Sequence, residues 1–210
     1  MQIDAAIESY KRALQIKPDS AAIYNNMGNA LNDKGDPEAA IACYKQALII
    51  KPDYAQVYNN MGATLNGKGN HEAAIDSFKQ ALKIKPEYAE AHNNMGNALK
   101  DKGELEAAID SFKQALKINP NYAEAYNNMG VILSNNGDPD AAVDNYNKAI
   151  KIKPSYAEAH KNLGLILADL GRLQEAEVSY RQAIALKPDY AEAYFNLGAI
   201  LTDLGRLQEA

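Results

Sequence analysis

The sequence predicts an all-α fold of stacked helix pairs, and three observations support this prediction. A proline recurs every 34 residues, apolar side chains recur at helical spacing between these prolines, and no segment alternates apolar and polar residues over a useful length. The recurrent prolines are Pro18, Pro52, Pro86, Pro120, Pro154 and Pro188. Because one helix pair is too small to bury both of its faces, the pairs are expected to stack into a solenoid.

The period divides the 210 residues into five full units and a partial unit at each end. Residues 1–20 supply the second part of one unit, and residues 191–210 supply the first part of another. The full units are 21–54, 55–88, 89–122, 123–156 and 157–190. We therefore expect a single solenoid over 1–210, which is either a piece of a longer protein or a chain whose ends other chains cover.

The first helix of each unit carries one apolar stripe. In unit 55–88, Tyr58, Met61 and Leu65 follow one another at spacings of three and four residues, which is the helical period. Gly69 follows the stripe and is expected to end this helix.

The second helix begins at a capping residue and stops before the recurrent proline. Asn70 is the expected cap in unit 55–88, and two other units show Asp36-Pro37 and Asp138-Pro139 at this place. The apolar face of this helix in unit 55–88 consists of Ala74, Ile75, Phe78, Ala81 and Leu82. Proline cannot continue the hydrogen-bond ladder, so the helix is expected to stop before it.

Small residues recur where the two helices of a unit are expected to meet. A glycine stands in the middle of every first helix, although glycine costs about 1 kcal/mol relative to alanine there. These glycines are Gly28, Gly62, Gly96, Gly130, Gly164 and Gly198, and the facing alanines are Ala40, Ala74, Ala108, Ala142 and Ala176. The aromatic residues four places after the alanines are Tyr44, Phe78, Phe112, Tyr146 and Tyr180. We expect close helix packing, with the aromatic rings filling the space toward the next unit.

Composition excludes several classes of protein. The net charge of −5 gives no basic face for nucleic acid. The single cysteine, Cys43, excludes an intrachain disulfide and a cysteine zinc cluster. No apolar run approaches the length of about 18 residues that a membrane span needs, and the first ten residues do not resemble a signal peptide. These observations predict a soluble, cytoplasmic protein without a cofactor.

The unit resembles the tetratricopeptide repeat (TPR) over the whole chain. The resemblance rests on the 34-residue period, the glycine, the alanine, the aromatic residue and the terminal proline described above. The frequent tryptophan of that family is replaced here by Tyr24, Tyr58, His92, Tyr126, His160 and Tyr194. The resemblance implies a right-handed superhelix of antiparallel helix pairs whose first helices line a concave groove.

An asparagine occupies the sixth place of every unit, which the resemblance assigns to the groove. These residues are Asn26, Asn60, Asn94, Asn128, Asn162 and Asn196, and their neighbours at the fifth place include Asn59, Asn93 and Asn127. Asparagine is a poor helix former, so its recurrence calls for a compensating role. The amides are predicted to bind the backbone of an extended peptide, as a similar asparagine ladder does in O-linked N-acetylglucosamine transferases. Alternatively, they tie neighbouring units together or face water.

Acidic residues near the first helices bear on the charge of the partner. Glu90, Glu124, Glu158 and Glu192 each stand three residues after a potential cap, so their main predicted role is a capping box. They also make the predicted groove acidic. TPR domains that clamp acidic chaperone tails use lysine or arginine in the groove, and only Lys161 stands at a matching place. The predicted partner is therefore a neutral to basic peptide or protein.

No catalytic or metal site is predicted. The stretch from Gly62 to Gly69 nearly matches a phosphate-binding loop, but Gly69 replaces the hydroxyl residue that would hold magnesium. His71, His92 and His160 lie in different units without the spacing of metal ligands, and the last two are predicted to be core aromatic residues.

The two ends predict self-association. The helix near the start is expected to leave Ile7, Tyr10 and Leu14 partly uncovered, and the last helix is expected to expose Tyr194, Leu197 and Leu201. Packing of one end on the other in a second molecule would be a head-to-tail contact that does not close.

The predicted function is a non-enzymatic scaffold that binds a protein or peptide segment. Two alternatives remain open at this stage: a substrate-selecting arm of a larger enzyme such as a glycosyltransferase, and a self-assembling structural module.

Overall fold

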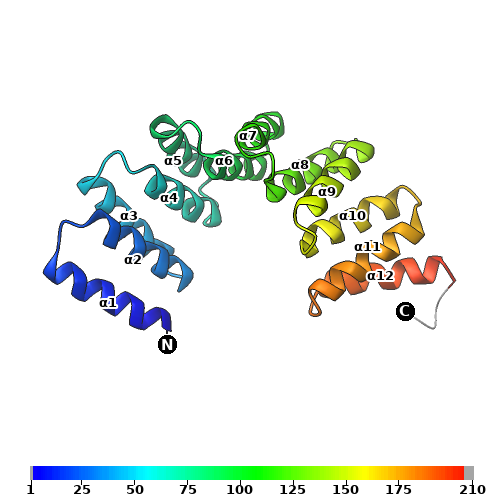
Figure 1. The fold of residues 1–210 in the computed structure, drawn as a ribbon, viewed down its shortest axis with the longest axis horizontal. Coiled ribbons are helices and arrows are strands. Elements are labelled where there is room, and N and C mark those ends of the chain that lie inside the picture. The colour runs from blue at the N-terminus through cyan, green and yellow to red at the C-terminus, as the bar shows by residue number, and fades with distance from the viewer. Residues whose placement is uncertain (1, 206–210) are drawn as a thin grey trace. The chain divides into compact units, whose positions relative to one another are not determined.

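The computed structural model describes residues 2–205, and every element in this range is a helix (Figure 1). The helices are α1 (Gln2–Ile16), α2 (Ala21–Asp33), α3 (Pro37–Ile50), α4 (Ala55–Gly67), α5 (His71–Ile84), α6 (Ala89–Lys102), α7 (Leu105–Ile118), α8 (Ala123–Asn135), α9 (Pro139–Ile152), α10 (Ala157–Asp169), α11 (Leu173–Leu186) and α12 (Ala191–Asp203). The predicted all-α fold of helix pairs is confirmed. The predicted start of a further helix after residue 205 lies outside the described residues.

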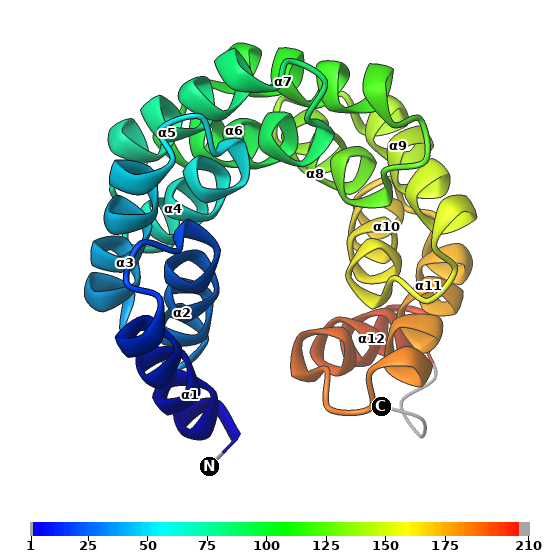
Figure 2. The ribbon, with the colours of Figure 1, turned by 60° about the vertical axis from the view of Figure 1, so that its left-hand side comes forward.

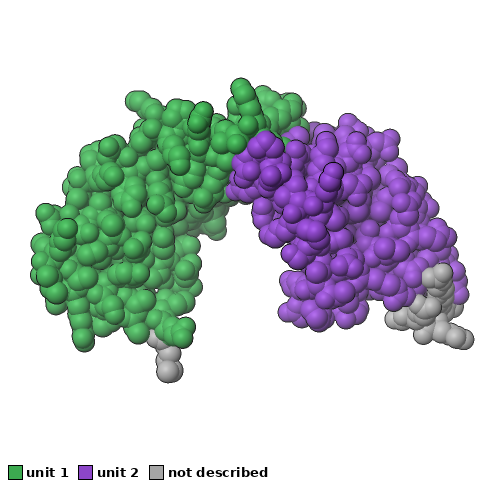
Figure 3. All heavy atoms as spheres, in the orientation of Figure 1, with its two compact units in different colours: residues 1–118 green, residues 119–210 purple. Residues whose placement is uncertain are grey.

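The chain divides into two compact units of structure, residues 1–118 and residues 119–210, called unit 1 and unit 2 below (Figure 3). Unit 1 contains α1–α7, and unit 2 contains α8–α12. In both, the two helices of one repeat pack together most extensively, and the second helix then packs on the first helix of the next repeat.

Within each unit the helices form two layers (Figure 2). The first-helix layer consists of α2, α4 and α6 in unit 1 and of α8, α10 and α12 in unit 2. The second-helix layer consists of α3, α5 and α7 in unit 1 and of α9 and α11 in unit 2. This arrangement positions every recurrent asparagine in the first-helix layer.

The mid-helix glycines allow the aromatic rings to lie directly on the first helices. A Cβ atom built on Gly62 would stand 2.7 Å from Cε1 of Phe78, which real side chains do not tolerate. Phe78 is fully buried, as are the facing alanines of all five full repeats. Tyr44 also packs against Val57 of the next repeat. The predicted close packing is confirmed, and it explains why a residue that weakens a helix recurs in its middle.

The helix ends follow the predicted signals in part. The Oδ1 atoms of Asp36 and Asp138 accept hydrogen bonds from the backbone N–H groups of Ala39 (3.1 Å) and Ala141 (3.2 Å). Asn70 stands at the N-cap of α5 but makes no side-chain capping bond. Gly69 takes a φ of +80° just after α4, a conformation that favours glycine.

Candidate functional site

The sixth-place asparagines lie in the first-helix layer and form bonds between repeats. Asn94 Nδ2 donates to Asn59 Oδ1 at 3.1 Å, and Asn162 Nδ2 donates to Asn127 Oδ1 at 3.1 Å. Asn60 Nδ2 donates to Asn25 Oδ1 at 3.0 Å and also to Asn29 Oδ1 at 3.1 Å. In each case the donor belongs to one repeat and the acceptor to the repeat before it. The amides therefore tie neighbouring repeats together, which is one of the alternatives that the sequence left open.

The fifth-place asparagines are buried, so the prediction that they lie open to a peptide is wrong. The exposed fraction is 1% for Asn59, 5% for Asn93 and 1% for Asn127. Helix α6 packs over α4, and Asn59 Nδ2 donates to Glu90 Oε1 of α6 at 3.1 Å, while α10 packs over α8, which carries Asn127. A buried amide keeps a helix stable only when it is hydrogen-bonded, and these bonds satisfy that need.

The sixth-place residues differ in how much surface they keep. Asn26 is exposed, Asn60, Asn94, Asn128 and Asn196 are half-buried, and Asn162 is buried. The bond to Asn59 uses one of the two N–H groups of Asn94, and no other bond joins this side chain to the described residues. Asn94 thus keeps donor capacity on the first-helix layer.

The predicted capping box does not form. The N-cap residues of α6, α8, α10 and α12 are Tyr88, Tyr122, Tyr156 and Tyr190, and none of them makes a side-chain capping bond. Because these caps stand one residue later than expected, the glutamates fall at the second helical position, and two of them pair with lysines instead. Glu124 accepts from Lys153 at 2.8 Å, and Glu192 accepts from Lys161 at 3.2 Å.

Unit 2 breaks the asparagine pattern with a pocket between α10 and α12. The fifth place holds Lys161 in α10 and Phe195 in α12, and Leu165 lies one turn beyond Lys161. Together with Ala191, Glu192 and Asn196, these residues line a cavity of about 510 Å³. Phe195 is 78% exposed and Leu165 is 45% exposed. Sequence reasoning missed this pocket, although the two departures from the asparagine pattern were its visible signal.

Lys161, the basic residue of the pocket lining, is paired within unit 2. Lys161 Nζ donates to Glu192 Oε2 at 3.2 Å and lies 5.9 Å from the centre of the Tyr190 ring. Burial raises the pKa of Tyr190, and the nearby Lys161 ammonium acts in the opposite direction. With its cation paired, the pocket offers mainly the apolar faces of Leu165 and Phe195.

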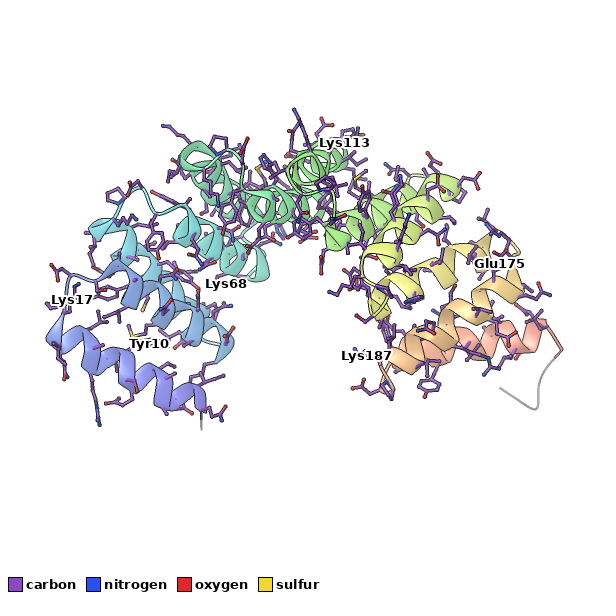
Figure 4. All side chains as sticks on the ribbon, in the orientation of Figure 1. Tyr10, Lys17, Lys68, Lys113, Glu175 and Lys187 are labelled. Atoms are coloured by element: carbon purple, nitrogen blue, oxygen red, sulfur yellow. The ribbon has the colours of Figure 1, made fainter. Side chains whose placement is uncertain are left out.

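Half of the residues predicted to be exposed at the ends are buried. Ile7 is 6% exposed because α1 packs on α2, and Leu197 and Leu201 are 8% and 1% exposed because α12 packs on α11. Tyr10 on α1 (Figure 4) and Leu14 are half-buried, and Tyr194 is 51% exposed. The prediction of an open apolar face is therefore wrong for Ile7, Leu197 and Leu201.

Two histidines that were predicted to be core residues are only partly buried. His92 and His160 are half-buried. Nε2 of His92 lies 3.1 Å from the backbone oxygen of Pro86, and Nε2 of His160 lies 3.0 Å from that of Pro154.

Burial raises the pKa of the Cys43 thiol, so this cysteine stays protonated. Within residues 2–205, no group of three metal-ligating side chains comes together. In the same range, no helix combines the length and apolar character that crossing a membrane requires.

Stacked helix pairs with a period of 34 residues, and a glycine under an aromatic ring in each, are characteristic of a TPR domain. The family model described as the cilia and flagella-associated protein 70 C-terminal domain, a TPR family, matches residues 1–210. The chain belongs to this TPR family. No curated protein sequence matches the chain.

Solved structures agree with this assignment. The crystal structure of MamA is 31% identical over 79% of this chain and 97% of its own, with a TM-score of 0.67. YrrB, described as a TPR protein with an unusual peptide-binding site, is 26% identical over 90% of this chain and 97% of its own, with a TM-score of 0.64. TTC0263, a thermophilic TPR protein from Thermus thermophilus, shares the fold at 22% identity over 87% of this chain and all (100%) of its own, with a TM-score of 0.72.

Proposed function

We propose that this TPR protein is a non-enzymatic scaffold that binds an extended segment of a partner protein on the first helices of unit 2. The observation that carries the proposal is the pocket between α10 and α12, where Leu165 and Phe195 leave apolar surface open. A ligand site typically combines such an apolar cavity with a few polar groups that fix orientation. YrrB, the relative described as peptide-binding, supports a peptide as the class of ligand.

The proposed roles divide between side chains and backbone. An apolar side chain of the partner would fill the cavity beside Phe195, while Asn196 in the same lining would hydrogen-bond the partner's backbone. One such bond contributes only about 0.5–1.5 kcal/mol net, so the pocket must supply most of the discrimination. The asparagines of unit 1 with surface left, Asn60 and Asn94, are proposed to contact a partner backbone in the same way.

The partner is proposed to be neutral to basic. Glu158 and Glu192 are exposed in the first turns of α10 and α12. Lysine or arginine near the partner's apolar residue would meet these carboxylates, whereas an acidic tail would be repelled.

Head-to-tail self-association has weaker support. It would need the apolar faces of α1 and α12, and Ile7, Leu197 and Leu201 are already buried within their own units. Tyr194 remains the exposed member of that set. A role as the substrate-selecting arm of an enzyme has no support of its own in the fold.

The test is a peptide array probed with the purified chain, followed by fluorescence anisotropy with the best peptides. Phe195→Asn restores the residue found at this place in unit 1, and Leu165→Asn does the same at its own place, so neither change should disturb the helices. We expect each to weaken binding at least about tenfold, which corresponds to about 1.4 kcal/mol. Asn196→Ala should weaken it several-fold. Lys113→Ala on α7 (Figure 4) is the control, and equal binding by all four variants would contradict the proposal.

A further inference from the structure

Each unit also carries a groove on the other side of its first-helix layer. In unit 1 the groove lies between α5 and α7, above α6, and has a volume of about 530 Å³. In unit 2 the groove lies between α9 and α11, above α10, and has a volume of about 360 Å³. The two grooves use the same places of the repeat, so Ile75 and Leu99 in unit 1 correspond to Val143 and Leu167 in unit 2.

The two grooves differ sharply in charge. Six charged residues line the groove of unit 1: Glu72, Asp76, Lys79, Lys102, Glu104 and Asp110. The groove of unit 2 instead has the neutral side chains of Asn147, Gln174 and Ser179 and a single ion pair. In that pair Arg172 donates twice to Glu175, with both distances 2.7 Å. Glu175 lies on α11 (Figure 4). The lining of this groove therefore presents no charge that lacks a partner among the described residues.

Val178 makes the rim of the unit 2 groove apolar, although the fold does not require an apolar residue at this place. It is 68% exposed, while the floor residues Leu163 and Leu167 are 8% and 3% exposed. The same place in unit 1 holds Asp110, whose side chain is 79% exposed. Because an aspartate is accepted there, stability does not require valine, and an exposed β-branched residue is also a mediocre helix former. The apolar rim continues the apolar floor, so the two form one surface.

We propose that the groove between α9 and α11 is a second docking site, which takes an uncharged segment of a partner protein that inserts a large aliphatic side chain against Val178. A groove with no unpaired charge is complementary to such a segment, and charged side chains would lose hydration there without gaining a partner. Its volume of about 360 Å³ is within the usual range of about 300–1,000 Å³ for binding clefts. Leu165 of the pocket proposed above lies two residues from both Leu163 and Leu167, which places it on the opposite side of α10.

The probe is a library of 12-residue peptides displayed on phage, selected on the full chain. Synthetic copies of the enriched peptides are then measured by fluorescence anisotropy against Val178→Asp, which reproduces unit 1 at this place. We expect the enriched peptides to share a leucine, isoleucine or methionine. Their affinity should fall at least about tenfold in Val178→Asp and change less than about twofold in Phe195→Asn. The reciprocal Asp110→Val in unit 1 should leave this affinity unchanged.

Folding is checked by circular dichroism, and Val178→Thr, which keeps the shape of valine, serves as a second variant. It should weaken binding by a smaller factor than Val178→Asp does. The proposal is overturned if every enriched peptide binds Val178→Asp as well as the wild type, or if the library shows no enrichment over that variant. If those peptides are all lost in Phe195→Asn, they support the pocket between α10 and α12 instead.

Discussion

Asn94 on α6 donates a hydrogen bond of 3.1 Å to Asn59 on α4, across a separation of 35 residues. The same separation joins Asn60 to Asn25 and Asn162 to Asn127. In each bond a half-buried or buried donor therefore lies one repeat plus one residue after a buried acceptor in the sequence. The asparagine ladder is first a structural element of the solenoid, and any contact with a partner uses the capacity that these bonds leave over.

Asn59→Ala should destabilise the chain by about 1–3 kcal/mol, because it leaves the amide of Asn94 without its acceptor in a half-buried site. The free energy of unfolding in urea measures this loss. Asn32→Ala on α2 is the control, since Asn32 is exposed and its replacement should cost less than about 0.5 kcal/mol. Equal losses in both variants would show that the bond does not stabilise the solenoid.

Gly96→Ala should also destabilise the chain, by about 1–3 kcal/mol, although alanine is the better helix former. The new Cβ would stand 2.7 Å from Cε1 of the buried Phe112, so the ring must move. Gly67→Ala, at the end of α4 with no atom within 4 Å of the added Cβ, should instead be neutral or stabilising by up to about 1 kcal/mol. Thermal unfolding of the two variants compares them directly, and a stabilised Gly96→Ala would contradict the packing described above.

Asp138→Ala should cost about 0.5–2 kcal/mol, because Asp138 caps α9 through its bond to the N–H of Ala141. Asn70→Ala is the matched change at a cap whose side chain makes no such bond, and it should cost clearly less. Urea denaturation followed by circular dichroism checks the order of the two losses. The reverse order would mean that the cap residue acts through backbone conformation alone.

Alkaline pH should destabilise unit 2 through Tyr180. Burial, with a smaller contribution from Asp169, raises the pKa of this tyrosine to about 12. A group whose pKa is raised in the folded state stabilises that state below its ordinary pKa near 10 and loses the contribution as the pH rises toward about 12. Tyr180→Phe should therefore lose less stability than the wild type between pH 10 and pH 12. All other ionisable groups are common to both proteins, so parallel curves would remove Tyr180 as the cause.

Several helix ends were predictable because they depend on local chemistry. Proline stops a helix wherever it occurs, a glycine such as Gly69 accepts a positive φ, and an aspartate before Pro139 caps the helix that follows. The pairing of the mid-helix glycines with aromatic rings was also predictable, since both recur with the repeat.

The environment of the asparagines was not predictable in the same way. Adjacent residues of a helix differ in direction by about 100°, so a small error in helix phase exchanges an open side chain for a covered one. Asn59 and Asn60 are neighbours of identical type, and only the position of α6 and of Glu90 makes the first of them fully buried. The capping box failed for a related reason, because α6 begins at Ala89 after the N-cap Tyr88, which puts Glu90 one position too early in the helix.

The grooves and pockets depend on which repeats have diverged. Leu165, Val178 and Phe195 are visible in the sequence as departures from the pattern, but their exposure follows from the packing of neighbouring helices. A departure from a repeat is therefore a signal for function only once the surrounding helices are in place.

The separation of 35 residues has a consequence for protein engineering. Excision of residues 55–88 as one cassette would give Asn94 the sequence separation from Asn25 that Asn60 now has. The hydrogen bond between the two side-chain amides would then form again across the junction. Loss of a single residue inside a first helix would break this correspondence in every bond that crosses the cut. The array is thus modular in steps of one whole repeat, and lengthened or shortened versions should fold when they respect that step.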